Sequence, residues 1–152
     1  MQIAKPRQNG LAVSVQASLL ADTNAPQLFL VVHLLNITNR ELVVLTKNLN
    51  CDFDLIESNK WICTLGYNHP GVTYEGHLIV PSVYDFSPVT IKPNEEAIIT
   101  QLIERNRSLK QITKETQMTV YYAISPEWGS RFSSWIGSAK SKSFVPALKE
   151  SH

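Results

Sequence analysis

The chain of 152 residues has the usual length of a single domain. Its formal net charge of +1 shows no excess of Lys and Arg of the kind by which proteins bind nucleic acid. Only 18% of the residues are charged, below the average of about 25%, which slightly favours a secreted or periplasmic protein over a cytoplasmic one. No run reaches the roughly 18 to 20 apolar residues of a transmembrane helix, so we expect no transmembrane segment.

The first half of the chain predicts two hairpins. Residues 11–20 alternate between apolar and polar side chains, which is typical of a half-buried strand. The next stretch, "QLFLVVHLLNI", is apolar on both faces and predicts a central strand. A short "TNR" turn then joins it to "ELVVLTKNL", so residues 27–49 are interpreted as a hairpin. Residues 51–65 form the second predicted hairpin, with "ESN" as its turn.

The second half of the chain is more broken. Gly and Pro interrupt residues 66–93, where short strands are expected at "HLIV" and "PVTI", and such a long connection suits a Greek key. We then expect a strand at 96–104 and a short helical turn at 107–113. Residues 121–137 are interpreted as two strand runs around a turn, with a tryptophan at its tip. About seven to nine strands follow from this pattern, without a repeat or an internal linker.

Four stretches occur in an order that is known from other proteins: "LFLVVHLLNITNRELVV", "VTIKPNEEAIIT", "TVYYAIS" and "SSWIGSAKSKSF". This order resembles the immunoglobulin-like or fibronectin-like β-sandwich. The resemblance implies an all-β fold, a single Greek-key sandwich over residues 11–145, with an N-terminal extension at 1–10 and a C-terminal tail at 146–152. Such folds often place a tyrosine near the start of the penultimate strand, where it hydrogen-bonds back to nearby backbone, as Tyr121 or Tyr122 would here.

The two cysteines, Cys51 and Cys63, lie in neighbouring strands of the second predicted hairpin. With "ESN" as the turn, Phe53 pairs with Trp61 and Cys51 with Cys63, which brings the two sulfurs within reach of a bond. Two interpretations stay open: a cross-strand disulfide in an oxidising compartment, or two reduced thiols that act as small hydrophobic groups. Antibody-type domains bridge strands across their two sheets instead, so the resemblance implies no antibody-type function.

Motifs for common enzyme chemistry are missing from the sequence. There is no GxSxG, no Gly-rich phosphate loop and no HExxH, so we expect neither an enzyme nor a cofactor. Without a CxxC pair or clustered His, we expect no zinc site either. Asp52, Asp54 and Glu57 could bind calcium, but a solvated strand face with Lys60 opposite Asp54 is favoured.

The candidate binding residues gather around Trp128. A rigid aromatic ring at a hairpin tip offers contact area at a small entropic cost, and Glu127 and Arg131 could add polar contacts around it. Tyr67 and Tyr74 belong to another loop that could reach the same end. The alternative is that the ring folds over the open end of the sandwich and plugs the core. The sequence leaves both interpretations open.

A second candidate surface is the outer face of the predicted 27–49 hairpin. The apolar side chains expected there are Phe29, Val31, Leu35, Val43 and Leu45. Either the long segment 66–93 covers this face, or the hairpin is the interface of a homodimer.

Taken together, these features favour a non-enzymatic recognition module that binds another protein through its end loops or through a strand edge. One alternative is a carbohydrate-binding module, in which Trp128, Tyr67 or Tyr74 would stack on sugar rings. A second alternative is an immunoglobulin-like proteinase inhibitor that inserts "NHPGVTYEG" or "PEWGSRF" into a protease cleft.

Overall fold

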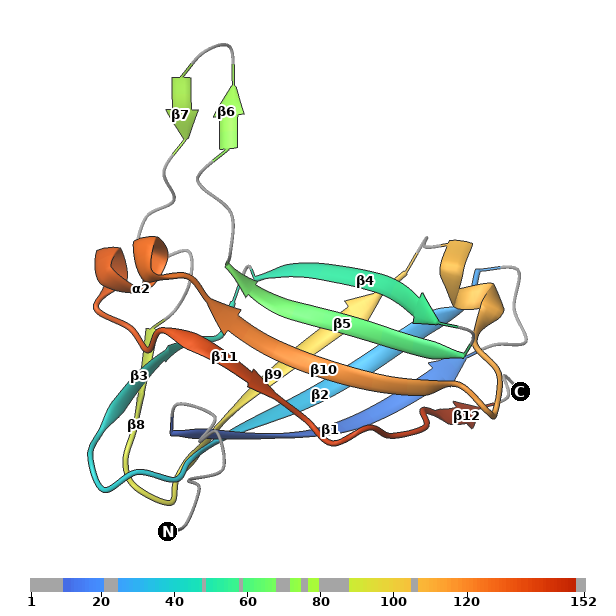
Figure 1. Ribbon diagram of the computed structural model, residues 1–152, viewed down its shortest axis with the longest axis horizontal. Coiled ribbons are helices and arrows are strands. Elements are labelled where there is room, and N and C mark those ends of the chain that lie inside the picture. The colour runs from blue at the N-terminus through green and yellow to red at the C-terminus, as the bar shows by residue number, and fades with distance from the viewer. Residues whose placement is uncertain are drawn as a thin grey trace, which may run out of the picture.

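The computed structural model describes residues 10–20, 25–47, 49–57, 59–67, 72–74, 77–79, 88–104 and 107–149, with the backbone alone for 72–74, 77–79 and 107–108. Within these residues the protein is mostly β, with twelve strands, one 3-10 helix and one short α-helix (Figure 1). No helix in the described part of the chain is long and apolar enough to cross a membrane.

Most strands belong to two four-stranded sheets. Sheet I has the order β12 (Ala147–Lys149), β1 (Leu11–Leu20), β2 (Gln27–Asn36) and β9 (Glu96–Ile103). Sheet II has the order β11 (Gly137–Lys140), β10 (Gln117–Ile124), β5 (Lys60–Tyr67) and β4 (Asn50–Glu57). Each sheet contains one parallel pair, β1 with β12 and β5 with β10.

The remaining elements are short. Two further sheets have two strands each, β3 (Leu42–Leu45) with β8 (Pro88–Ile91) and β6 (Val72–Tyr74) with β7 (His77–Ile79). The 3-10 helix η1 (Arg107–Gln111) lies where a helical turn was predicted, and the α-helix α2 (Pro126–Phe132) follows β10.

The core lies between the two large sheets, which face one another in Figure 1. The predicted alternation of residues 11–20 is confirmed, because Leu11, Val13 and Leu19 point inward. Full burial of such a side chain contributes about 1.5 to 3 kcal/mol. The buried side chains of sheet I are Leu11, Val13, Leu19, Leu28, Leu30, Val32, Leu34, Ala97, Ile99 and Ile103. Those of sheet II are Trp61, Cys63, Leu65, Met118, Val120, Tyr122, Ile124 and Ala139.

The all-β class is therefore confirmed, whereas the immunoglobulin-like topology is not. Immunoglobulin-type domains consist of two antiparallel sheets, but β5 and β10, the two central strands of sheet II, run parallel here. The tyrosine that hydrogen-bonds to backbone is Tyr122, and its partner is Leu45 in β3, 77 residues earlier. This bond joins sheet II to a remote strand instead of closing a local corner.

The predicted hairpin over residues 27–49 is wrong. β2 pairs with β1 and β9, as its two apolar faces predicted for a central strand, and β3 pairs with β8. The buried side chain of Asn36 explains the change of direction. Its Nδ2 donates to the carbonyl oxygens of Arg40 at 2.7 Å and Ile91 at 3.0 Å, and its Oδ1 accepts from the N–H of Thr38 at 2.9 Å. These bonds hold the turn against the end of β8, so the chain pairs there.

The two strands predicted around residues 121–137 are confirmed in part, since β10 and β11 pair antiparallel, but the short turn between them is wrong because α2 forms there. Pro126 occupies the start of the helix, where its fixed φ is favourable and its missing N–H costs nothing. The helix ends at Ser133, whose φ of 52° is the left-handed conformation typical of helix ends. Ser-Pro-Glu at 125–127 was the sequence signal for this helix.

Candidate functional site

Trp128 is fully buried and does not form an exposed tip. Its ring meets the ring of Tyr67 edge-on at 4.2 Å between centroids and stacks on Phe132 at 5.9 Å. The guanidinium carbon of Arg131 lies 4.9 Å from the centre of the indole ring. Of the two interpretations left open by the sequence, the structure shows the ring that packs over the end of the core.

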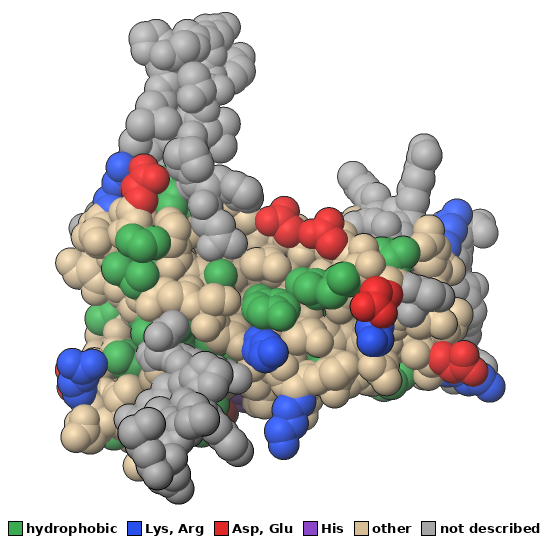
Figure 2. All heavy atoms as spheres, viewed as in Figure 1, with side chains coloured by type: hydrophobic (Ala, Val, Ile, Leu, Met, Phe, Trp, Pro, Cys, Tyr) green, Lys and Arg blue, Asp and Glu red, His purple; other side chains and the backbone are tan. Residues whose placement is uncertain are grey.

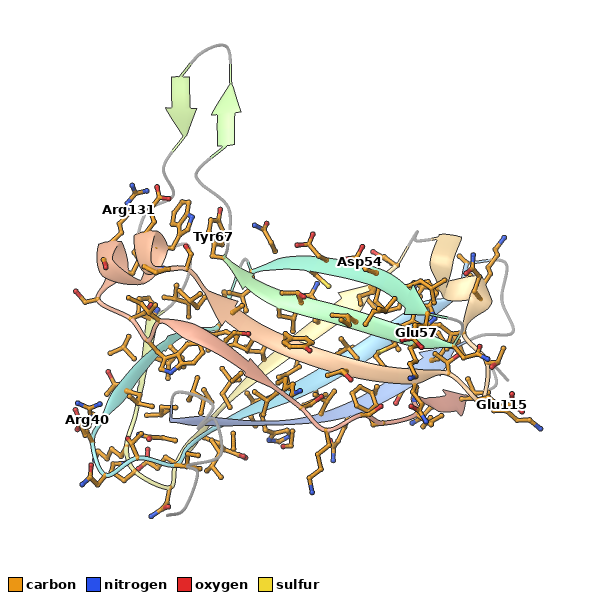
Figure 3. The ribbon with its side chains drawn as sticks, in the orientation of Figure 1. Arg40, Asp54, Glu57, Tyr67, Glu115 and Arg131 are labelled. Atoms are coloured by element: carbon orange, nitrogen blue, oxygen red, sulfur yellow. The ribbon has the colours of Figure 1, made fainter. Side chains whose placement is uncertain are left out.

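The structure brings Tyr67, Trp128 and Arg131 together, because the ring of Trp128 contacts both of the other side chains. Figure 3 shows Arg131 on α2 and Tyr67 at the end of β5 on the same end of the molecule. Glu127 and Arg131 are exposed, and Tyr67 is half-buried. The N–H of Ser125 donates to the carbonyl oxygen of Tyr67 at 2.9 Å, which anchors the start of α2 to β5. The side chain of Tyr74, in β6, lies outside the described residues.

A patch of exposed apolar side chains covers the outer face of sheet I. Phe29 is 44% exposed on β2 and lies directly opposite Leu102, 44% exposed on β9, while Ile98 is 52% exposed on the same strand. Val31, half-buried between them, completes what we call the β2–β9 patch. Three members of the face predicted for the 27–49 hairpin are thus partly accessible: Phe29, Val31 and Leu35.

The other two members of that predicted face lie elsewhere. Val43 and Leu45 belong to β3, outside sheet I, and Leu45 is fully buried. The described strands of segment 66–93 pair with each other or with β3, β4 and β10, not with sheet I. The rest of that segment, which was expected to cover the face, lies outside the described residues.

A groove of about 300 Å³ runs along the outer edge of β9. One wall consists of Ile98, Ile99, Thr100 and Gln101, and the other of Thr46, Lys47 and Leu49 from the link between β3 and β4. Beside it, Nδ1 of His33 lies 3.1 Å from Oε1 of Glu96. The groove and the β2–β9 patch therefore meet along one strand.

The terminal strands of the two large sheets differ in how they are protected against pairing with another chain. β4 carries Asp52 and Asp54 and has a bulge between Leu55 and Glu57. β11 has four residues and β12 has three, and each ends in a lysine. β9 has eight residues, and from 97 to 103 it contains no charge, no proline and no register shift. Short length, charge and bulges are the usual means by which proteins block edge strands, so among the described terminal strands β9 has the fewest of these features.

A second groove, of about 540 Å³, lies where β1 meets β10 and β11. It is lined by Ala12, Val13, Thr119, Tyr121, Lys140, Ser141, Lys142 and Ser143. None of the described residues that line it is acidic. Figure 2 views the outer face of sheet II, where acidic side chains gather over β4 and hydrophobic ones occupy the middle. Lys140 and Lys142 line this groove, whereas Asp52 and Asp54 lie on β4 at the other side of sheet II.

The two cysteines are close to each other although they do not pair directly. Their Sγ atoms are 3.5 Å apart, and both thiols are free. The predicted register is wrong by two residues, since Cys51 lies opposite Leu65 and Phe53 opposite Cys63. Because the error is an even number, each side chain stays on its predicted face. The rings of Phe53 and Trp61 still stack, at 4.7 Å and 7°.

The predicted pairing of Cys51 with Cys63 would centre the hairpin on Glu57, whereas a turn over residues 57–59 places Leu55 opposite Trp61 and Cys51 opposite Leu65, which is the observed register. Glu57 pairs with Lys60, Asn59 adopts a φ of 62°, and the pairing shifts between Leu55 and Glu57. Lys60 is therefore not opposite Asp54, and its Nζ lies 3.5 Å from Oε2 of Glu57 instead. No group of three or more His, Cys, Asp or Glu that could hold a metal ion occurs in the described part of the chain.

Comparison with known proteins returned no match to a family model, a curated protein or a solved structure. The geometry of the described residues is thus the basis for a functional proposal. Sequence reasoning found the strand that carries the groove but not its position at the end of a sheet, which depends on the pairing of distant segments.

Proposed function

We propose that this protein is a non-enzymatic recognition module that binds another protein by adding an extended segment of that partner to the free edge of β9. The observation that carries this proposal is the eight-residue terminal strand, uncharged from 97 to 103, with a groove along its edge. A terminal strand presents unpaired N–H and C=O groups, and an added strand satisfies them while its side chains provide specificity. In this proposal the two large sheets form a β-sandwich that holds β9 in place.

The groove and the patch indicate the chemistry of the partner segment. Successive side chains of an added strand point to opposite faces of the sheet. Those on the outer face would lie beside Ile98 and Leu102 and extend the β2–β9 patch, which favours apolar side chains at every second position. Lys47 lines the opposite wall of the groove, so an acidic side chain of the partner would be favoured next to it.

The two alternative functions have less support from the geometry. A carbohydrate module needs accessible aromatic faces, and the ring of Trp128 is buried between Tyr67 and Phe132. A protease cleft takes an extended loop, whereas residues 126–132 form α2. The other proposed inhibitory segment, 68–76, lies outside the described residues except for the backbone of β6.

Peptides selected from a random display library against the purified protein provide the probe for a test. We expect the bound peptides to slow hydrogen exchange of the amides in 96–103. We expect Ile98→Lys to weaken their binding at least about tenfold, because a charge then lies on the edge that pairs. Ser138→Lys places the same charge on an exposed position of β11 and is the matched control, which should bind like the wild type.

Two results would overturn the proposal. One is protection of α2 and the end of β5 in place of β9, which would locate the site at the Arg131 end. The other is equal binding by Ile98→Lys and the wild type. Sedimentation without peptide tests whether the partner is a second copy of this chain. A concentration-dependent dimer that Ile98→Lys abolishes would show that a second copy binds at the edge of β9.

A further inference from the structure

Cys51 and Cys63 form an isolated pair of thiols in a packed environment. Their sulfurs are 3.5 Å apart in the neighbouring strands β4 and β5. The stacked rings of Phe53 and Trp61 lie on the same face of this strand pair. Two thiols held at this distance need a relative movement of only about 1.5 Å to reach the length of a disulfide bond, about 2.05 Å.

The two thiols differ in access. Cys51 is half-buried and belongs to β4, a terminal strand of sheet II, whereas Cys63 is fully buried in the next strand. Cys51 is therefore the more accessible of the two cysteines to a reagent from solution. Access and thiolate character together determine which cysteine reacts first.

The hydrogen bond between the thiols also favours Cys51 as the cysteine that reacts first. By accepting a hydrogen bond from Cys63, the Cys51 sulfur is stabilised as a thiolate, which lowers its pKa, although burial and the nearby Asp52 carboxylate oppose this effect. Donation of that hydrogen bond and burial raise the pKa of Cys63 well above its usual range. Cys51 thus has the features of an attacking thiol and Cys63 those of a resolving thiol.

We propose that Cys51 and Cys63 are a reversible thiol–disulfide site, oxidised by a low-molecular-weight disulfide of the glutathione type. In the first step, the Cys51 thiolate attacks one sulfur of the small disulfide, whose S–S bond breaks. One small thiolate leaves and takes a proton from water, and the other half stays on Cys51 as a mixed disulfide.

In the second step, Cys63 loses its proton to water and attacks the sulfur of Cys51. The Cys51–Cys63 bond forms, and the second small thiolate leaves and is protonated. In total, the two protein thiols lose two electrons and two protons, and the small disulfide becomes two thiols. The product ties the terminal strand β4 covalently to β5.

The test compares the wild type with Cys51→Ser and Cys63→Ser, each treated with oxidised glutathione, quenched with an alkylating reagent and weighed intact. The wild type should lose two hydrogens and retain no glutathione at the end point, and reduction with a dithiol should restore both thiols. Cys63→Ser should accumulate one glutathione, because the resolving thiol is missing. Cys51→Ser should react at least about ten times more slowly than Cys63→Ser, because its remaining thiol is buried.

A second measurement uses the wild type alone and does not depend on how well the variants fold. Peptide mapping of samples quenched at early times should find the mixed disulfide on Cys51. In the oxidised protein, amides of residues 50–57 should exchange at least about tenfold more slowly than in the reduced protein. A mixed disulfide on Cys63, a stable wild-type adduct with glutathione, or equal rates for the two variants would overturn the proposal. None of these results bears on peptide binding at β9.

Discussion

The hydroxyl group of Tyr122 makes a double hydrogen bond whose loss has a calculable effect on stability. It donates to the carbonyl oxygen of Leu45 at 2.9 Å and accepts from the N–H of the same residue at 2.9 Å. Both residues are fully buried, and the ring of Tyr122 stacks on Trp135 at 5.4 Å. Tyr122→Phe removes the oxygen and keeps the ring, so it isolates the two hydrogen bonds.

The expected loss in the free energy of unfolding is about 2 to 6 kcal/mol. Each buried backbone group that loses its hydrogen-bond partner costs about 1 to 3 kcal/mol, and the substitution leaves one donor and one acceptor in this position. The cavity term is small because only one atom is removed. Since typical domains unfold with 5 to 15 kcal/mol, the effect is a substantial fraction of the total.

Urea unfolding followed by tryptophan fluorescence measures this loss. Tyr121→Phe, in the same strand but on its half-buried outer face, is the matched control and should change stability by less than about 0.5 kcal/mol. If Tyr122→Phe matched this control, the bond to Leu45 would not contribute to stability, and the structural link between β10 and β3 would need another explanation.

Three further predictions concern pH, the buried tryptophan and a close approach of two strands. Burial raises the pKa of Tyr122 well above its unfolded value of about 10. The free energy of unfolding should therefore be unaffected by this group below pH 10 and should fall above it, because the tyrosine ionises first in the unfolded chain. Urea unfolding of Tyr122→Phe should lack this pH-dependent fall. Trp128→Ala should lower the unfolding free energy by about 3 to 5 kcal/mol and Arg131→Ala by less than about 1 kcal/mol. If urea unfolding gave equal losses of unfolding free energy for the two variants, the packing of Trp128 described above would be contradicted. Gly66→Ala should prevent normal folding, since its Cβ would collide with the carbonyl oxygen of Ala123 at a φ of 152°; a wild-type circular dichroism spectrum would refute this.

Local patterns predicted the elements that depend only on neighbouring residues. The inward face of residues 11–20, the strand predicted at 96–104 and the helical turn predicted at 107–113 agree with the structure to within one or two residues. Alternation of apolar side chains reports which face of a strand is buried, because successive side chains point to opposite faces. The helix α2 was missed because the apolar side chains around it were interpreted as strand runs, although Ser-Pro-Glu indicated a helix start.

The candidate site was only partly accessible to sequence reasoning. Tyr67, Trp128 and Arg131 were singled out, but the contact between Tyr67 and Trp128 joins residues from β5 and α2 and could not be predicted from either segment. The hairpin over 27–49 failed for a related reason. Adjacent strands need not pair, and here the hydrogen bonds of Asn36 to Arg40 and Ile91 direct the chain to a different partner strand.

By itself, the sequence determined the β-rich class and the side chains that point into the core, because these follow from the short-range geometry of a strand. Only the tertiary structure decided that β9 is the terminal strand of its sheet among the described residues, since a sheet edge exists only after distant segments have paired. It also decided how Cys51 and Cys63 meet. The observed register differs by two residues from the predicted one, which preserves the face of each side chain but changes which residues lie opposite.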